Sequence, residues 1–86
     1  MNAAAQDPAL LARVEKAFRR AFGPRVAFHE RLDRSSEARW TSLKHVELLI
    51  ALEVEFGVRF DGTDATDLTS VERILERLAA RLAVAQ

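Results

Sequence analysis

Hydrophobic positions recur at helical spacing in three stretches of the chain, and the first stretch covers residues 7–22. Asp7 can cap this helix, Pro8 suits its first turn, and Gly23-Pro24 end it. The apolar residues fall on one face, as expected for a helix that packs against a core. They are Leu10, Leu11, Val14, Ala17, Phe18, Ala21 and Phe22.

The second stretch predicts a helix that opens at Trp40-Thr41-Ser42-Leu43, with Thr41 as its cap, and ends at Phe56 before Gly57. At about 100° per residue, its apolar side chains form two stripes on nearly opposite faces. A small bundle readily buries only one of them, so the second stripe is partly covered by the long loop, left for a partner or cargo, or both. The stripe assigned to the core is Leu48, Leu49, Leu52 and Phe56, and the second stripe is Leu43, Val46, Ile50 and Val54.

The third stretch begins with Thr69-Ser70-Val71-Glu72, which matches a capping box with Thr69 as the cap. Before it, residues 61–64 read as a turn and residues 65–68 as one short helical turn. Val58 and Phe60 are expected to pack against the core. The apolar positions of the last helix are Val71, Ile74, Leu75, Leu78 and Leu82.

Residues 23–40 have no sustained period, and a connection of this length is often functional. We expect Val26, Phe28 and Leu32 to anchor it to the bundle and Trp40 to pin its end. The whole pattern predicts an all-α four-helix bundle, with three longer helices, one short helix and a long loop between the first two. We expect a single domain over residues 1–86, with an ordered core of about residues 7–83.

Composition narrows the class of protein. The chain has no cysteine, so its stability must come from helix packing, and any thioester chemistry needs a thiol from a prosthetic group. A net charge of zero argues against a nucleic-acid binder. No apolar run reaches the ~18 residues of a membrane span, and residues 1–6 lack the features of a secretory signal, so we expect a cytoplasmic protein.

The charges are unevenly distributed along the chain. Residues 1–41 include eight basic and five acidic residues, whereas residues 42–86 include five basic and eight acidic residues. The acidic middle segment, residues 42–68, is either a solvated face or a face that steers a basic partner.

The stretch SLKHVELLIALEVEFGV, residues 42–58, resembles the second helix of acyl carrier proteins. Residues 7–22 resemble the family's first helix in length and position. In that family, the serine that opens the second helix is esterified with 4′-phosphopantetheine, so the resemblance implies Ser42 as the attachment site. From residue 58 to Leu78 the likeness continues without a gap through Phe60, Ala65, Leu68, Thr69, Val71 and Leu75.

The resemblance implies a non-enzymatic carrier that holds an acyl or aminoacyl group as a thioester and delivers it to partner enzymes. The implied partners are a phosphopantetheinyl transferase, an acyl-activating ligase and an acyltransferase or synthase, and we expect the carrier to be a monomer. The residues that match the family's partner-binding positions are Leu43, Val46, Glu47, Ile50, Glu53 and Val54.

A physical argument for Ser42 accompanies the resemblance. The first N–H groups of a helix lack acceptors within it and the helix dipole favours negative charge there, so a phosphodiester on Ser42 would be stabilised. Two residues depart from the family pattern, because Thr41 replaces the usual Asp and Lys44 replaces a commonly acidic residue. These changes make the docking surface about three charges more positive, which favours either a divergent transferase or no modification at all.

Other chemistry fits the sequence less well. Residues 61–67 resemble a calcium loop, but Ala65 and Thr66 stand where a ligand and a glycine are needed. His45 is one turn from Ser42 without an orienting carboxylate, which argues against a hydrolase, and with His29 it makes too few ligands for a metal site. Two alternatives to the carrier stay open: an unmodified carrier-like interaction module, and an unrelated helical regulator or dimerisation domain.

Overall fold

The computed structural model describes residues 7–84, which form four α-helices and one 3₁₀ turn, without any strand. The all-α, four-helix prediction is therefore confirmed for this part of the chain, and the expectation for residues 1–6 lies outside it. None of the helices in residues 7–84 has the length and apolar character needed to cross a bilayer. The elements are α1 (Pro8–Phe22), η2 (Arg34–Ser36), α2 (Ser42–Phe56), α3 (Gly62–Asp67) and α4 (Val71–Val84).

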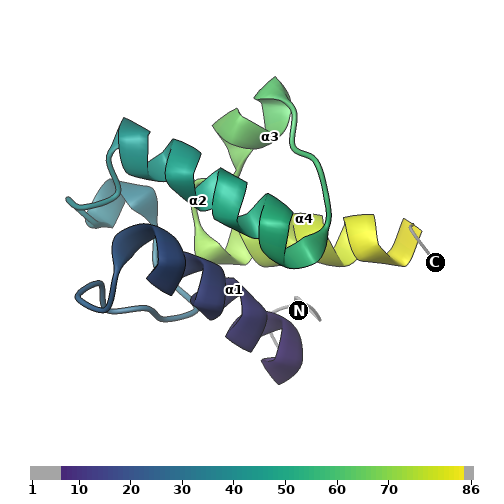
Figure 1. The fold of residues 1–86 in the computed structure, drawn as a ribbon, viewed down its shortest axis with the longest axis horizontal. Coiled ribbons are helices and arrows are strands. Elements are labelled where there is room, and N and C mark those ends of the chain that lie inside the picture. Colours follow the sequence, from purple (N-terminus) through teal and green to yellow (C-terminus); the bar gives the residue numbers. More distant parts are fainter. Residues whose placement is uncertain (1–6, 85–86) are drawn as a thin grey trace.

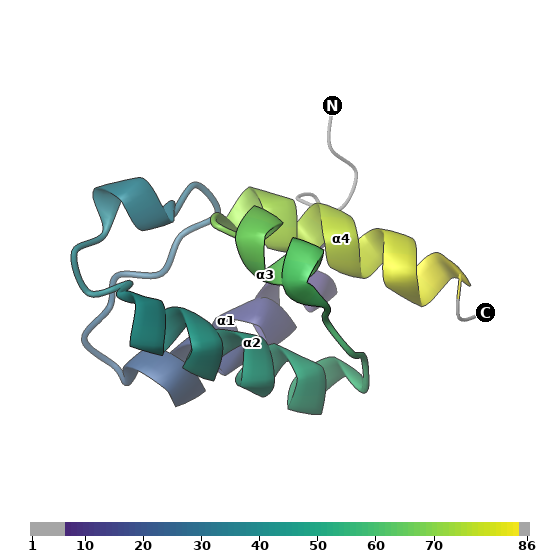
Figure 2. The same cartoon turned by 90° about the horizontal axis from the view of Figure 1, so that it is seen from above.

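The helices pack around one core. α1 and α2 run antiparallel and side by side, α4 packs against α1, and the short α3 lies on the opposite side of α2 from α1 (Figure 1). The long connection and η2 gather at one end of the bundle, beside the start of α2 (Figure 2). The core side chains with no exposed surface include Val14 and Phe18 from α1, Leu48 and Leu52 from α2, and Val71, Ile74, Leu75 and Leu78 from α4.

The ends of α1 and α2 follow the predicted signals. The Asp7 carboxylate accepts hydrogen bonds from the N–H groups of Ala9 and Leu10, and Pro8 occupies the first helical position. Gly57 ends α2 in the left-handed region, with a φ of 65°, which a residue without a side chain adopts at little cost.

The expected turn at residues 61–64 is wrong, because α3 already begins at Gly62. Asp61 and Asp64 form a reciprocal capping box, in which each carboxylate accepts the other residue's N–H at 2.9 Å. This pairing satisfies N–H groups that a helix start leaves without partners. The helix therefore starts three residues before the predicted one.

The cap predicted for the last helix is also displaced by one residue. The N–H of Arg73 donates to Ser70 Oγ at 3.1 Å, so Ser70 caps α4 in place of Thr69. Thr69 instead uses its carbonyl to accept the N–H of Arg34 at 2.9 Å, and the N–H of Val71 donates to the Leu32 carbonyl at 2.9 Å. These contacts join the long connection to the start of α4.

The long connection is packed, as its apolar residues predicted. Val26 and Leu32 are buried and Phe28 packs against the core. The Phe18 ring lies 5.1 Å from the Phe28 ring and 5.2 Å from the Trp40 ring, measured between centroids. Trp40 thus fixes the end of the connection immediately before α2. The sequence pattern did not predict η2.

Candidate functional site

Ser42 is the first residue of α2 and is exposed to solvent. Thr41 caps the helix in front of it, with its hydroxyl accepting the N–H of Lys44 at 3.2 Å. The N–H groups of Ser42 and Leu43 lie in the first turn, where the helix itself provides no acceptor. The hydroxyl is therefore presented outward at the positive end of a helix.

Arg34 lies beside this hydroxyl. Its Nη2 donates to Ser42 Oγ at 3.0 Å, and its Nε donates to the Trp40 carbonyl at 3.1 Å. The backbone N–H of Arg34 also donates to the Thr69 carbonyl, just before α4. Contacts with Trp40, Ser42 and Thr69 together hold the guanidinium next to Ser42. Sequence reasoning did not find Arg34, because it lies in the aperiodic connection and its partner is eight residues away.

Lys44 does not extend freely into solvent from the first turn of α2. Its Nζ lies 2.9 Å from Glu47 Oε2 and donates to the carbonyl of Ala21 at 3.1 Å. The lysine thus covers the C-terminal end of α1, where the helix dipole favours a cation. Glu47, one of the predicted partner-binding residues, is therefore part of an ion pair on the surface.

The second stripe of α2 is left uncovered. Leu43, Val46, Ile50 and Val54 are 68%, 53%, 54% and 67% exposed, whereas Leu48 and Leu52 of the opposite stripe are fully buried. We call the four exposed residues the outer face of α2. Single exposed apolar residues are ordinary, but four at helical spacing form a continuous apolar strip. More than half of the surface of each of these four residues is therefore exposed.

A groove runs along one side of the outer face, between α1 and α2. It has a volume of about 270 Å³ and is mainly apolar. Ile50 and Val54 line it from α2, and Arg20 lines it from α1. The remaining lining residues are Ala21, Glu47 and Ala51.

Cations line the α1 side of this region. Arg13, Lys16 and Arg20 recur at helical spacing on α1, and we call them the basic row. Glu55 of α2 lies 3.1 Å from the Arg13 Nε and 3.6 Å from the Lys16 Nζ. The hydrogen bond from Arg13 and the charge of Lys16 outweigh partial burial and lower the pKa of Glu55 below its ordinary value.

His45 supports the start of α2 from inside. It is buried, its Nδ1 accepts the indole N–H of Trp40 at 2.9 Å, and its Nε2 lies 2.7 Å from the Ala65 carbonyl. Because the indole N–H and the carbonyl have fixed roles, Nε2 carries the proton. Both ring nitrogens are therefore engaged in the fold, and neither is directed at Ser42.

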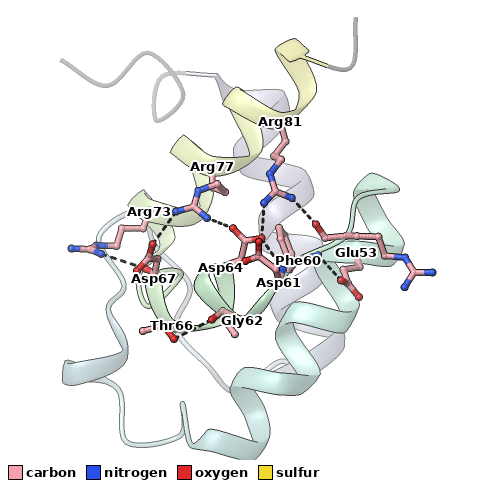
Figure 3. Close-up of polar contacts among 12 residues, drawn as sticks. Glu53, Phe60, Asp61, Gly62, Asp64, Thr66, Asp67, Arg73, Arg77 and Arg81 are labelled. Atoms are coloured by element: carbon pink, nitrogen blue, oxygen red, sulfur yellow. Dashed lines mark hydrogen bonds and ion pairs between the residues drawn. The ribbon is translucent and has the colours of Figure 1, made fainter.

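Glu53, the other acidic residue among the predicted partner-binding positions, is turned toward the loop after α2. Its carboxylate accepts the N–H of Phe60 at 2.7 Å, as Figure 3 shows. The side chain remains partly exposed, so it fixes the loop while keeping some contact with solvent. The structure thus separates Glu53 from the outer face in role, although both belong to α2.

Asp64 anchors α3 to α4. Its side chain is 1% exposed and binds the guanidinium groups of Arg77 and Arg81, with 2.5 Å between Asp64 Oδ2 and Arg81 Nη2 (Figure 3). Burial acts to raise the pKa of Asp64, but the N–H of Asp61 and the Arg81 guanidinium outweigh it, so the pKa lies below its ordinary value. The carboxylate is thus committed to the fold.

Within residues 7–84, no group of three or more His, Asp or Glu side chains is arranged to hold a metal ion. The side chains of Arg34 and Ser42 meet at the exposed start of α2. Comparisons of the chain with protein-family models, with curated proteins and with solved structures find no match.

Proposed function

We propose that this chain is an acyl-carrier-type protein, with a bundle of the acyl-carrier type, whose Ser42 takes a 4′-phosphopantetheine arm. The observation that carries the proposal is the exposed Ser42 hydroxyl at the first position of α2, with the Arg34 guanidinium 3.0 Å away. The carrier would hold an acyl or aminoacyl group and deliver it to partner enzymes that dock on the outer face of α2.

The residues around Ser42 fit a phosphodiester. Attachment from coenzyme A forms a bond from Ser42 Oγ to phosphorus while a P–O bond of the donor's pyrophosphate breaks. Adenosine 3′,5′-bisphosphate leaves, the hydroxyl proton passes to a base of the transferase, and the phosphodiester product keeps one negative charge. The Arg34 guanidinium and the N–H groups of the first turn would offset that charge. Exposure of Ser42 leaves the hydroxyl accessible to a modifying enzyme.

The arm supplies the thiol that this cysteine-free chain lacks, on a tether long enough to reach partner active sites. The protein's own contribution is to hold the attachment point still. Trp40 and His45 pack beneath the first turn of α2, and Thr41 caps it. A fixed attachment point and a docked partner make each transfer effectively intramolecular.

A second candidate function is an unmodified interaction module that uses the same helix. Lys44 favours it, because its ion pair with Glu47 removes acidic character from the surface that a common transferase would meet. This candidate keeps the exposed outer face of α2 and needs no arm.

Intact mass tests the proposal. Co-expression with a broad-specificity phosphopantetheinyl transferase is expected to add about 340 Da, the mass of the phosphopantetheinyl group. Ser42→Ala should abolish the gain, whereas Ser36→Ala, at an exposed serine in η2, should keep it. Circular dichroism of both variants checks that the helices are retained.

A double variant, Thr41→Asp with Lys44→Asp, separates the two candidates. It restores the acidic residues that the acyl-carrier pattern has at these two positions. If the wild-type chain gains no mass with any transferase, including one encoded beside it, while the double variant does, the chain is the unmodified module. If neither gains mass although both are folded, Ser42 is not an attachment site.

A further inference from the structure

We propose that the groove between α1 and α2 docks an acidic amphipathic helix of a partner protein. Its apolar side chains would lie on Ile50 and Val54, and its carboxylates over the basic row of α1. This inference rests on the proposed function in treating the outer face of α2 as a partner surface, but it does not require the arm on Ser42.

The apolar half of the match comes from the outer face of α2. Its residues lie at positions i, i+3, i+7 and i+11 and so form a strip about 16 Å long. A helix presents an apolar ridge of the same period, and the groove of about 270 Å³ is a hollow into which such a ridge fits. A flat lipid surface has no ridge to fill this hollow.

The charged half of the match comes from α1. Arg13 and Lys16 are paired with Glu55, and Lys44 is paired with Glu47. Arg20 lines the groove and is exposed. Four cations therefore accompany two carboxylates along this edge, which leaves it positive.

A partner with a row of carboxylates complements this edge, whereas a partner with a basic docking surface is repelled by it. A second copy of the chain would bring the same excess of cations around the same face. The charge pattern thus favours an acidic helix from another protein.

Peptide titration tests the inference. The probe is an end-capped helical peptide of about five turns, with leucine along one face and glutamate on the flanking positions, and its counterpart has lysine at those positions. Each is added to the isotope-labelled Ser42→Ala protein, and amide signals are followed by NMR. We expect the amide signals of Arg20, Ile50 and Val54 to shift. At low salt the glutamate peptide should bind about tenfold more tightly than the lysine peptide, and this difference should shrink as salt is added.

Three variants locate the effect. Arg20→Glu should remove or reverse the preference for the glutamate peptide, and Ile50→Gln should weaken binding of both peptides about tenfold. Arg31→Glu is the matched charge control, because Arg31 is exposed and precedes Leu32, whose carbonyl is bonded at the start of α4. It should leave the preference unchanged.

Several outcomes overturn the inference. They are equal binding of the two peptides, shifts confined to another surface, an Ile50-dependent dimer in sedimentation without peptide, and stronger binding to vesicles of phosphatidylserine and phosphatidylcholine than to either peptide. Because the titration uses Ser42→Ala and the mass measurement uses the native serine, each proposal can fail without the other.

Discussion

His45 connects three segments of the protein through one side chain. It lies on α2, accepts the indole N–H of Trp40 at the end of the long connection, and reaches the Ala65 carbonyl of α3. Its burial next to the exposed Ser42 separates two roles within the first turn of α2: one residue is presented and the other holds the turn in place.

We expect His45→Ala to lower the free energy of unfolding by about 3 kcal/mol, because it leaves the Trp40 N–H and the Ala65 carbonyl unpaired and opens a cavity. Urea unfolding followed by circular dichroism measures this. Lys44→Ala, which removes a partly exposed ion pair, is the neighbouring control and should cost less than about 1 kcal/mol. Equal costs for the two variants would contradict the structural role of His45.

At the residue scale, sequence and structure agree where the signal is local. The positions of Thr41 and Ser42 follow from capping and helix spacing, and the structure places both as predicted. Arg34 and the pairing of Trp40 with His45 were not predictable in this way. They depend on how an aperiodic connection folds back onto α2, and no short-range pattern encodes that path.

At the scale of the element, α2 carries two faces with opposite roles. One stripe is buried in the core and the other is exposed. The sequence left open how far the long loop covers the second stripe, and the structure shows the stripe mostly exposed. A helix that keeps four apolar residues in water gives up stability that burial would supply. Under the proposed function, this face serves the docking of a partner and not the packing of this chain.

Substitutions on the two faces of α2 should differ sharply in cost. Ile50→Gln changes an exposed position and should alter the free energy of unfolding by no more than about 0.5 kcal/mol. Leu52→Ala removes buried volume and should cost about 3 kcal/mol. Urea unfolding of both variants provides the comparison. A large cost for Ile50→Gln would mean that the outer face is covered in solution.

The two errors at helix starts have physical causes. The α3 capping box uses Asp61 and Asp64, which read as turn residues when taken alone, and their reciprocal bonds set the start of the helix. At α4 the Ser70 hydroxyl accepts the N–H of Arg73, while the Thr69 carbonyl accepts the N–H of Arg34 in the long connection. In both places, the start of the helix depends on specific hydrogen bonds that the turn and helix propensities of single residues do not reveal.

At the scale of the whole molecule, α3 is fastened to α4 by charge. Asp64 is bound by Arg77 and Arg81 from α4, and the Arg77 guanidinium also lies 3.2 Å from Asp67 (Figure 3). Burial opposes the charged form of Arg77, but its two carboxylate partners outweigh it and raise its pKa. The basic and acidic halves of the sequence also meet in the fold, where Arg13 and Lys16 pair with Glu55.

This fastening predicts a dependence of stability on pH. The pKa of Asp64 lies below its ordinary value of 3.8, so its contribution is present above about pH 5 and is lost as the pH falls through the lowered pKa. Asp64→Asn should cost about 3 kcal/mol at pH 7, since it removes the carboxylate partner of Arg81 and one of the two carboxylate partners of Arg77. The variant should also lose less stability than the unsubstituted chain when the pH is lowered. Urea unfolding between about pH 3 and pH 7 measures both. If Asp64→Asn loses as much unfolding free energy on acidification as the unsubstituted chain does, this account is contradicted.

Peptide mapping of the modified protein tests the central claim, attachment at Ser42, most directly. Trypsin cleaves after Arg39 and Lys44, so residues 40–44 form a peptide with Ser42 as its one serine, while Ser35 and Ser36 leave in the preceding peptide. After incubation with coenzyme A and a transferase, we predict the added mass of about 340 Da on residues 40–44. Added mass on another peptide, or none on any peptide while a known carrier is fully modified in parallel, would contradict the claim.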